Sequence, residues 1–125
     1  MKAVQFQATG GPEVLEVVDV PTPVAGPGQV LVRQQAIGVN FIDTYHRSGL
    51  YPVQLPSRLG MEGAGVVEAV GADVTRFKAG DLVAYASGPL GAYAEYHAVA
   101  AGRAIALTEG IDATTGAAAM LKGMT

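Results

Sequence analysis

The sequence predicts a barrel-like β domain with a few helices at its edge, and three observations support that fold class. Short segments alternate apolar and polar residues with the period of two that is typical of strands with one buried face. Glycine and proline occur 17 and 7 times, and many of them separate these segments, where turns and tight corners need them. Half of the 125 residues are apolar, so the chain can bury the core of one domain.

The N-terminal part is expected to form a hairpin followed by a long strand. Segment 2–8 alternates and predicts the first strand, residues 10–12 form a glycine–proline turn, and segment 14–20 predicts the second strand. Residues 21–28 contain three prolines and are expected to form a rigid loop. Segment 29–39 is rich in apolar positions and gives the strongest strand prediction of the chain.

A short helix is predicted at 40–48. Asn40 is a residue type preferred at a helix N-terminus, and Gly49 is the type that commonly ends a helix. Residues 50–58 contain two prolines and are expected to be a loop. The later segments predict, in chain order, strands at 63–70, 81–86, 91–100 and 102–107 and an alanine-rich helix at 112–121.

Charge and cysteine content exclude several classes of function. The formal net charge is −3 without any run of basic residues, so we expect neither nucleic acid nor a membrane as a partner. The absence of cysteine excludes disulfides, thiolate metal ligands and a thiol nucleophile, and it agrees with a cytoplasmic location. The alternating N-terminus is expected to be a strand instead of a signal peptide, and no apolar run is long enough to cross a bilayer.

Two motifs carry the functional signal. The first is Gly60-Met61-Glu62-Gly63, which opens a glycine-rich segment that ends at Gly71, and the second is Gly38-Val39-Asn40-Phe41-Ile42-Asp43. Together they resemble the catalytic domain of the medium-chain alcohol dehydrogenase and quinone reductase superfamily. In its zinc enzymes the first motif reads Gly-His-Glu-Gly and the second reads Gly-x-Cys-His-x-Asp. Met61 and Asn40 therefore stand where that superfamily has a zinc-binding His and a zinc-binding Cys.

The resemblance covers residues 1–125 and has several implications. It implies a partly open β-barrel like that of the GroES co-chaperonin, and the zinc-free NADPH:quinone oxidoreductase branch that contains zeta-crystallin. In that superfamily a Rossmann domain follows, so residues 112–125 are expected to begin the helical link to a dinucleotide-binding domain that this chain lacks. The glycines at 60, 63 and 65 precede a strand, whereas a phosphate-binding turn must follow one. The alternative is a naturally short, single-domain protein.

The resemblance also suggests which residues contact the cofactor and the substrate. The candidate cofactor-binding residues are Asn40, Phe41, Asp43, Thr44, Tyr45 and Thr125, and the candidate catalytic residues are Asn40, Tyr45 and Tyr51. Each has a structural alternative. Asn40 can cap the helix through its side-chain oxygen, Asp43 can pair with Arg47 four residues later, and Tyr51 can pack on the neighbouring proline.

Three other residues were considered as candidates. A buried Glu62 without a metal needs another partner, such as Arg47 or backbone amides. His46 lies next to Tyr45 and could approach the pocket as a proton donor, but a structural or solvated role is the simpler interpretation, and His97 is expected to be structural. No cysteine or carboxylate lies at a metal-ligand spacing from either histidine, so no metal site is expected.

The resulting hypothesis is the substrate-side domain of an enzyme that transfers hydride from NADPH to quinones, enones or similar electrophilic carbonyls without zinc. The full-length protein is expected to be a cytoplasmic homodimer that acts on a small molecule. Two alternatives stay open. One is an enoyl reductase on the same scaffold, and the other is a non-catalytic, GroES-like binding module.

Overall fold

The computed structural model describes residues 1–86 and 89–107. The helix expected at 112–121, the link expected at 112–125 and the candidate residue Thr125 lie outside the described residues. The elements are β1 (Lys2–Phe6), β2 (Glu16–Asp19), β3 (Gln29–Gly38), α1 (Phe41–Ser48), β4 (Ser57–Arg58), β5 (Glu62–Val70), β6 (Leu82–Ala86), β7 (Tyr96–Ala100) and β8 (Ala104–Ala106), with short 3-10 turns at Pro12–Val14 and Ala101–Arg103.

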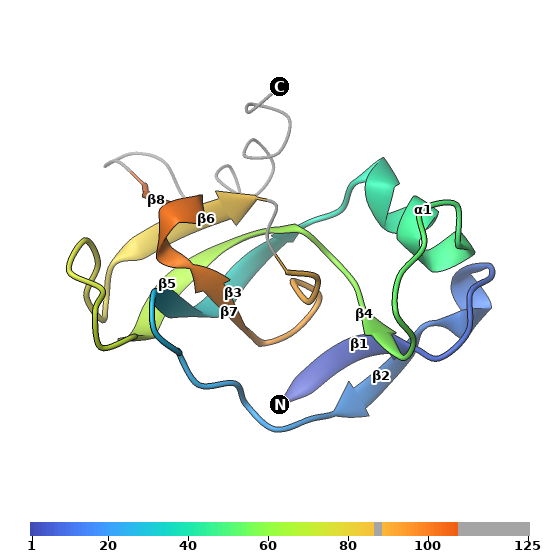
Figure 1. Ribbon diagram of the computed structural model, residues 1–125, viewed down its shortest axis with the longest axis horizontal. Helices are drawn as coiled ribbons and strands as arrows, with labels where there is room; N and C mark the ends of the chain where they lie inside the picture. Colours follow the sequence, from blue (N-terminus) through green and yellow to red (C-terminus); the bar gives the residue numbers. More distant parts are fainter. Residues whose placement is uncertain (87–88, 108–125) are drawn as a thin grey trace.

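The strands form two antiparallel sheets. The smaller sheet has the order β2-β1-β4, and the larger sheet has the order β7-β3-β5-β6-β8. A single bridge between Ala3 and Ala94 connects the strand β1 to the segment before β7. Figure 1 shows α1 beside the smaller sheet, at the end of the molecule away from β6 and β8. The predicted mainly β, partly open architecture is confirmed.

The register of the larger sheet positions the first motif against the second. Strand β3 pairs with β5 from Val30 opposite Val70 to Gly38 opposite Glu62, with two irregularities along the way. Helix α1 begins only three residues after Gly38. The end of β3, the start of β5 and the N-terminus of α1 therefore meet at one place.

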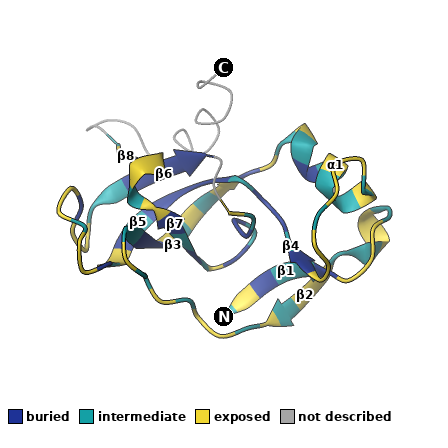
Figure 2. Ribbon diagram, viewed as in Figure 1, coloured by how far each residue is buried: buried dark blue, intermediate teal, exposed yellow. Residues whose placement is uncertain are grey.

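The main core lies against the larger sheet. Its fully or nearly fully buried members are Val30, Val32, Val67, Phe77, Val83, Tyr85, Ala92, Val99 and Ala104. Figure 2 shows that the first half of β5 and most of β6 are buried, whereas β2 and α1 are largely intermediate or exposed. Burial of apolar side chains on the central strands stabilises the sheet that carries the two motifs, at about 25 cal/mol per Å² of apolar surface removed from water.

Three predicted boundaries were wrong. The strand expected at 91–100 begins only at Tyr96, because the amides of Gly91 and Ala92 both donate to the carbonyl of Gly60 and hold the preceding segment as a loop. The region expected to be a loop at 50–58 ends in the short strand β4, which pairs with Gln5 and Phe6 at the end of β1. The hairpin strand expected at 14–20 is shorter, because a 3-10 turn occupies its first residue.

Side chains hold the loop 89–93 in place. Its carbonyls accept hydrogen bonds from His97 Nε2 to Pro89 (3.0 Å), from Arg58 Nη2 to Gly91 (3.3 Å) and from Gln34 Nε2 to Ala92 (3.0 Å). Because a carbonyl only accepts, His97 must carry its proton on Nε2. Burial lowers the pKa of His97, and the charge of Arg58 lowers it further, while the bond to Pro89 opposes both effects. His97 is therefore structural, as the sequence predicted.

Candidate functional site

The N-terminus of α1 is built by a reciprocal contact between its first residues. Asn40 occupies the N-cap position, as the sequence predicted, and Gly49 ends the helix in the left-handed conformation. The backbone amide of Asn40 donates to Asp43 Oδ2 at 3.1 Å, and the amide of Asp43 donates to the carbonyl of Asn40 at 3.0 Å. A carboxyl group in the first turn satisfies an exposed amide and complements the positive end of the helix dipole.

The side chain of Asn40 connects this helix end to β5. Its Nδ2 donates to Oε1 of Glu62 at 2.9 Å, and Glu62 is completely buried. Of the partners suggested for Glu62, Arg47 forms no ion pair with it in the described residues, and Arg47 Nε donates instead to the carbonyl of Gly10, 3.2 Å away. The alternative ion pair between Asp43 and Arg47 is also absent from the described residues.

Glu62 reaches this position because Gly38 leaves room for it. The two residues are directly opposite in the β3–β5 ladder. A Cβ atom at Gly38 would lie 2.1 Å from Glu62 Oε1 and 2.7 Å from its Cγ and Cδ atoms. Real Cβ atoms do not approach other heavy atoms so closely, so the glycine of the second motif makes space for the glutamate of the first.

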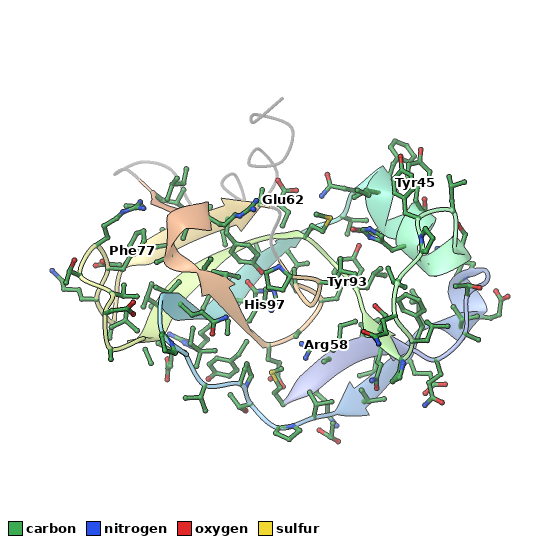
Figure 3. All side chains as sticks on the ribbon, in the orientation of Figure 1. Tyr45, Arg58, Glu62, Phe77, Tyr93 and His97 are labelled. Atoms are coloured by element: carbon green, nitrogen blue, oxygen red, sulfur yellow. The ribbon has the colours of Figure 1, made fainter. Side chains whose placement is uncertain are left out.

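Asp43 is also held by a residue that the sequence did not single out. Tyr93 donates its hydroxyl to Asp43 Oδ2 at 2.5 Å. Burial raises the pKa of Tyr93, and the hydrogen bond to Asp43 and the charge of Asp43 raise it further. Figure 3 shows Tyr93 in the middle of the molecule, whereas Tyr45 lies on α1. Sequence reasoning missed Tyr93 because it was assigned to a regular strand and its partner is 50 residues away.

A small cavity lies at the N-terminus of α1. It has a volume of about 330 Å³ and is lined by Val39, Asn40, Phe41 and Thr44. Val39 and Phe41 are 74% and 83% exposed, so two large apolar side chains flank an opening with polar groups beside it. The structure thus brings together three of the six candidate cofactor residues, Asn40, Phe41 and Thr44. Asp43 lies behind them, at 3% exposure, and faces Tyr93.

The two candidate tyrosines, Tyr45 and Tyr51, form an aromatic pair. Tyr45 directly follows Thr44, which lines this cavity. The rings of Tyr45 and Tyr51 are 5.4 Å apart in an edge-to-face arrangement, and the backbone amide of Tyr51 donates to the carbonyl of Tyr45. Tyr45 and Tyr51 are 37% and 50% exposed. Such pairs are worth about 0.5–1.5 kcal/mol beyond their buried area, so the contact favours this arrangement of the two rings. The ring of His46 lies 6.3 Å from that of Tyr51, so His46 flanks this aromatic pair.

A second, larger cavity of about 510 Å³ lies where β1, β3 and the segment before β7 meet. It is lined by Lys2, Ala3, Val4, Val17, Gln34, Gln35, Ala36, Ile37, Val39, Tyr93, Ala94 and Glu95. None of the candidate residues from the sequence lines it, although Val39 borders both cavities and Tyr93 lies between this cavity and Asp43.

The residues at the superfamily's metal position do not suit zinc. Zinc prefers thiolate, imidazole and carboxylate ligands, and this chain has an amide at Asn40 and a thioether at Met61. Among residues 1–86 and 89–107, no group of three His, Cys, Asp or Glu side chains is placed to hold a metal ion.

In the same described part of the chain, no helix has the length and apolar character that crossing a membrane requires.

Comparisons with known proteins agree with this geometry. Residues 26–109 match the alcohol dehydrogenase GroES-like domain family. The chain is 62% identical over 125 residues to the quinone oxidoreductase of Pseudomonas aeruginosa, covering 99% of this chain and 38% of that protein. It is 45% identical over 124 residues to a 2-haloacrylate reductase of a Burkholderia species, covering 93% of this chain and 37% of the relative.

A solved structure gives the same result. The quinone oxidoreductase of Escherichia coli complexed with NADPH superposes with a TM-score of 0.97 at 46% identity, covering 99% of this chain and 38% of that one. The chain thus spans less than two fifths of the length of the quinone oxidoreductases that it matches. Within the medium-chain superfamily, the chain is similar to the quinone oxidoreductases. From its two motifs, its sheet topology and these matches, we conclude that the chain belongs to the alcohol dehydrogenase GroES-like domain family.

Proposed function

We propose that this chain is the substrate-side domain of an oxidoreductase that transfers hydride from NADPH to quinones, enones or similar electrophilic carbonyls without zinc. The observation that carries the proposal is the Asn40–Glu62 hydrogen bond at the cavity beside α1. It provides a fixed amide at the position where zinc enzymes of the superfamily hold their metal. The similarity to quinone oxidoreductases, one of them in complex with NADPH, supports the same assignment.

The residues around the cavity fit a nicotinamide ring. Val39 and Phe41 provide apolar surface for a flat ring, and Asn40 and Thr44 provide polar groups for its carboxamide and ribose. The Thr44 hydroxyl already donates to the carbonyl of Phe41 at 2.6 Å, which leaves its oxygen lone pairs for a ligand donor. When bound, NADPH supplies the hydride, and the protein contributes alignment and exclusion of water. Most of the cofactor-binding surface is expected in a second domain that residues 112–125 would lead into, with Thr125 at the junction.

Reduction of a quinone to a hydroquinone needs one hydride and one proton. A quinone is already electrophilic at its ring and carbonyl carbons, so hydride addition does not require a Lewis acid. We assign Tyr45 and Tyr51 to acceptor binding, because their half-exposed rings offer apolar faces and their hydroxyls can donate to a quinone oxygen. The proton then reaches the reduced oxygen from one of these hydroxyls, which is replenished from water.

A second candidate acceptor is a carbon–carbon double bond activated by a carboxylate or carbonyl group. The similarity to a 2-haloacrylate reductase favours it specifically. Hydride would add to one alkene carbon and a proton to the other, with the same demands on the site. An enoyl thioester would be the related substrate of an enoyl reductase.

The test is NADPH oxidation by the longer protein that contains this chain, measured at 340 nm. We expect turnover with 1,4-benzoquinone, a strong preference over crotonyl-CoA, and unchanged activity after treatment with a zinc chelator. Absence of turnover with quinones, enones and haloacrylates would refute the proposal. Loss of activity on chelation, restored by zinc, would refute its metal-free part.

Two further measurements test the proposed assembly and location. A single species of twice the monomer mass by light scattering would support the homodimer. Recovery of the protein in the soluble cell fraction would support the cytoplasmic location.

A further inference from the structure

The N-terminal turn of α1 is fixed to the rest of the domain by two side-chain hydrogen bonds. One joins Asn40 to Glu62 on β5, and the other joins Asp43 to Tyr93 in the loop before β7. Asp43 Oδ2 accepts from the Tyr93 hydroxyl and from the backbone amide of Asn40 at the same time. A displacement of Tyr93 would therefore move the residue that holds Asn40.

Tyr93 is itself fixed by backbone on both sides. The amide of Val4 donates to the carbonyl of Tyr93 at 2.8 Å, and the amide of Tyr93 donates to the carbonyl of Leu59 at 2.9 Å. The ring lies against Gly60, where an added Cβ atom would come within 2.5 Å of the ring carbon Cδ1. Gly60 also has a φ of 102°, which favours glycine. The first motif therefore begins with a glycine that gives the Tyr93 ring its place.

The hydroxyl of Tyr93 acts only as a donor toward Asp43. Burial and the neighbouring Asp43 raise its pKa above the ordinary value for tyrosine, so the proton stays on the hydroxyl throughout the physiological range. The donor of this hydrogen bond is therefore present throughout that range. The contact links strand β1 and the backbone at residues 59–60, through one aromatic ring, to the first turn of α1.

We propose that Tyr93 is a positioning residue, which holds Asp43 and thereby fixes Asn40, Phe41 and Thr44 in the orientation that receives the nicotinamide ring. The inference rests on the proposed function of the cavity, and it adds a residue that lies outside both sequence motifs. Tyr93 does not line the small cavity, so its effect on the reaction is transmitted through Asp43.

The experiment compares Tyr93→Phe with Tyr85→Phe in the longer protein that contains this chain. Tyr85 is a matched control, because its buried hydroxyl accepts a hydrogen bond from Gln34 at 2.6 Å but makes no contact with α1 that the described residues record. Both variants keep the ring and lose one buried hydroxyl. A purely structural role for Tyr93 predicts that the two variants behave alike.

We expect Tyr93→Phe to lower kcat for NADPH oxidation at saturating quinone by tenfold or more, because small misplacements of aligned groups have large effects on rate. We expect Tyr85→Phe to retain kcat within about twofold, because its hydroxyl contacts neither α1 nor the residues that line the small cavity in the described part of the chain. A Tyr93→Phe enzyme with wild-type kcat, or equal losses in the two variants, would overturn the proposal.

Hydrogen exchange provides a readout that does not depend on activity. Tyr93→Phe should speed amide exchange at residues 40–44, and Tyr85→Phe should leave exchange there unchanged. If the wild-type protein oxidises no NADPH with any acceptor, the proposed function fails, and the exchange comparison still decides whether Tyr93 holds the start of α1. Equal exchange at residues 40–44 in the wild type and in Tyr93→Phe would overturn the positioning role by itself.

Discussion

The replacement Gly38→Ala tests the contact on which the whole site depends. An added Cβ atom would meet Glu62 Oε1 at 2.1 Å, with its Cγ and Cδ atoms at 2.7 Å. Glu62 is completely buried, so it has no exposed space into which to rotate. Overpacking typically costs about 1–3 kcal/mol. A displaced Glu62 also loses the donor from Asn40, which adds roughly 1–3 kcal/mol.

The two costs add to roughly 2–6 kcal/mol of unfolding free energy. With a urea m-value of about 2 kcal/mol/M, the unfolding midpoint should fall by roughly 1–3 M. The matched control is Gly102→Ala, because no atom lies within 4 Å of its added Cβ. That control should change stability by less than about 1 kcal/mol.

A double mutant tests whether the steric contact with Glu62 causes the loss of unfolding free energy in Gly38→Ala. All three of the nearest atoms belong to the Glu62 side chain beyond its Cβ. In a Glu62→Ala background, Gly38→Ala should therefore cost almost nothing, although Glu62→Ala alone is destabilising. Urea unfolding of the four proteins, followed by circular dichroism, gives the coupling energy directly. If Gly38→Ala is as stable as Gly102→Ala, or costs the same in both backgrounds, the reasoning about the site is refuted.

Three further predictions follow from the site and from the loop 89–93. His97 has a folded-state pKa below its unfolded value, so its contribution to stability is complete above pH about 6.5 and is lost as the pH falls from there toward the folded pKa. His97→Gln should flatten the loss of urea midpoint between pH 7.5 and 5.0, and an unchanged slope, with His46→Gln as the control, would contradict this. Asn40→Asp replaces the amide donor to Glu62 by a second acceptor, so it should lower the unfolding free energy by roughly 1–3 kcal/mol. A melting curve equal to that of the wild type would argue against the hydrogen bond. Tyr51→Phe should reduce kcat/KM for 1,4-benzoquinone by about tenfold, which is equivalent to one hydrogen bond of about 1.4 kcal/mol. The melting temperature should stay within about 2 °C of the wild-type value. Kinetics equal to those of the wild type would show that Tyr51 does not bind the acceptor.

Local signals in the sequence predicted the elements that carry the site. The alternation through 29–39 and the polar residue before a helical segment were enough to place β3 and the start of α1, and Asn40 lies at the predicted N-cap. These features are decided by residues within one or two turns of each other. The apolar pattern and the glycine-rich segment were likewise sufficient for the β-barrel architecture.

Contacts between distant residues could not be predicted in the same way. The sequence suggested Arg47 as a partner for Glu62, because opposite charges attract, but the barrel directs Arg47 toward Gly10 and brings Asn40 to Glu62. Tyr93 was read as part of a strand, because residues 91–100 have strand-like composition, whereas the carbonyl of Gly60 captures two of their amides. The two-residue strand β4 is too short to leave any periodic signal.

The hydrogen bond between Asn40 and Glu62 also bears on whether a zinc site could be introduced into this domain. Asn40→Cys would supply a thiolate ligand, but it would remove the amide donor from the completely buried carboxyl group of Glu62. Met61→His would supply an imidazole ligand, but the Asn40 amide would still occupy the position of the thiolate. The first of these changes alone weakens the fold before zinc can compensate for it. A zinc site introduced here therefore requires changes at both positions together, because a single substitution supplies one ligand without the other.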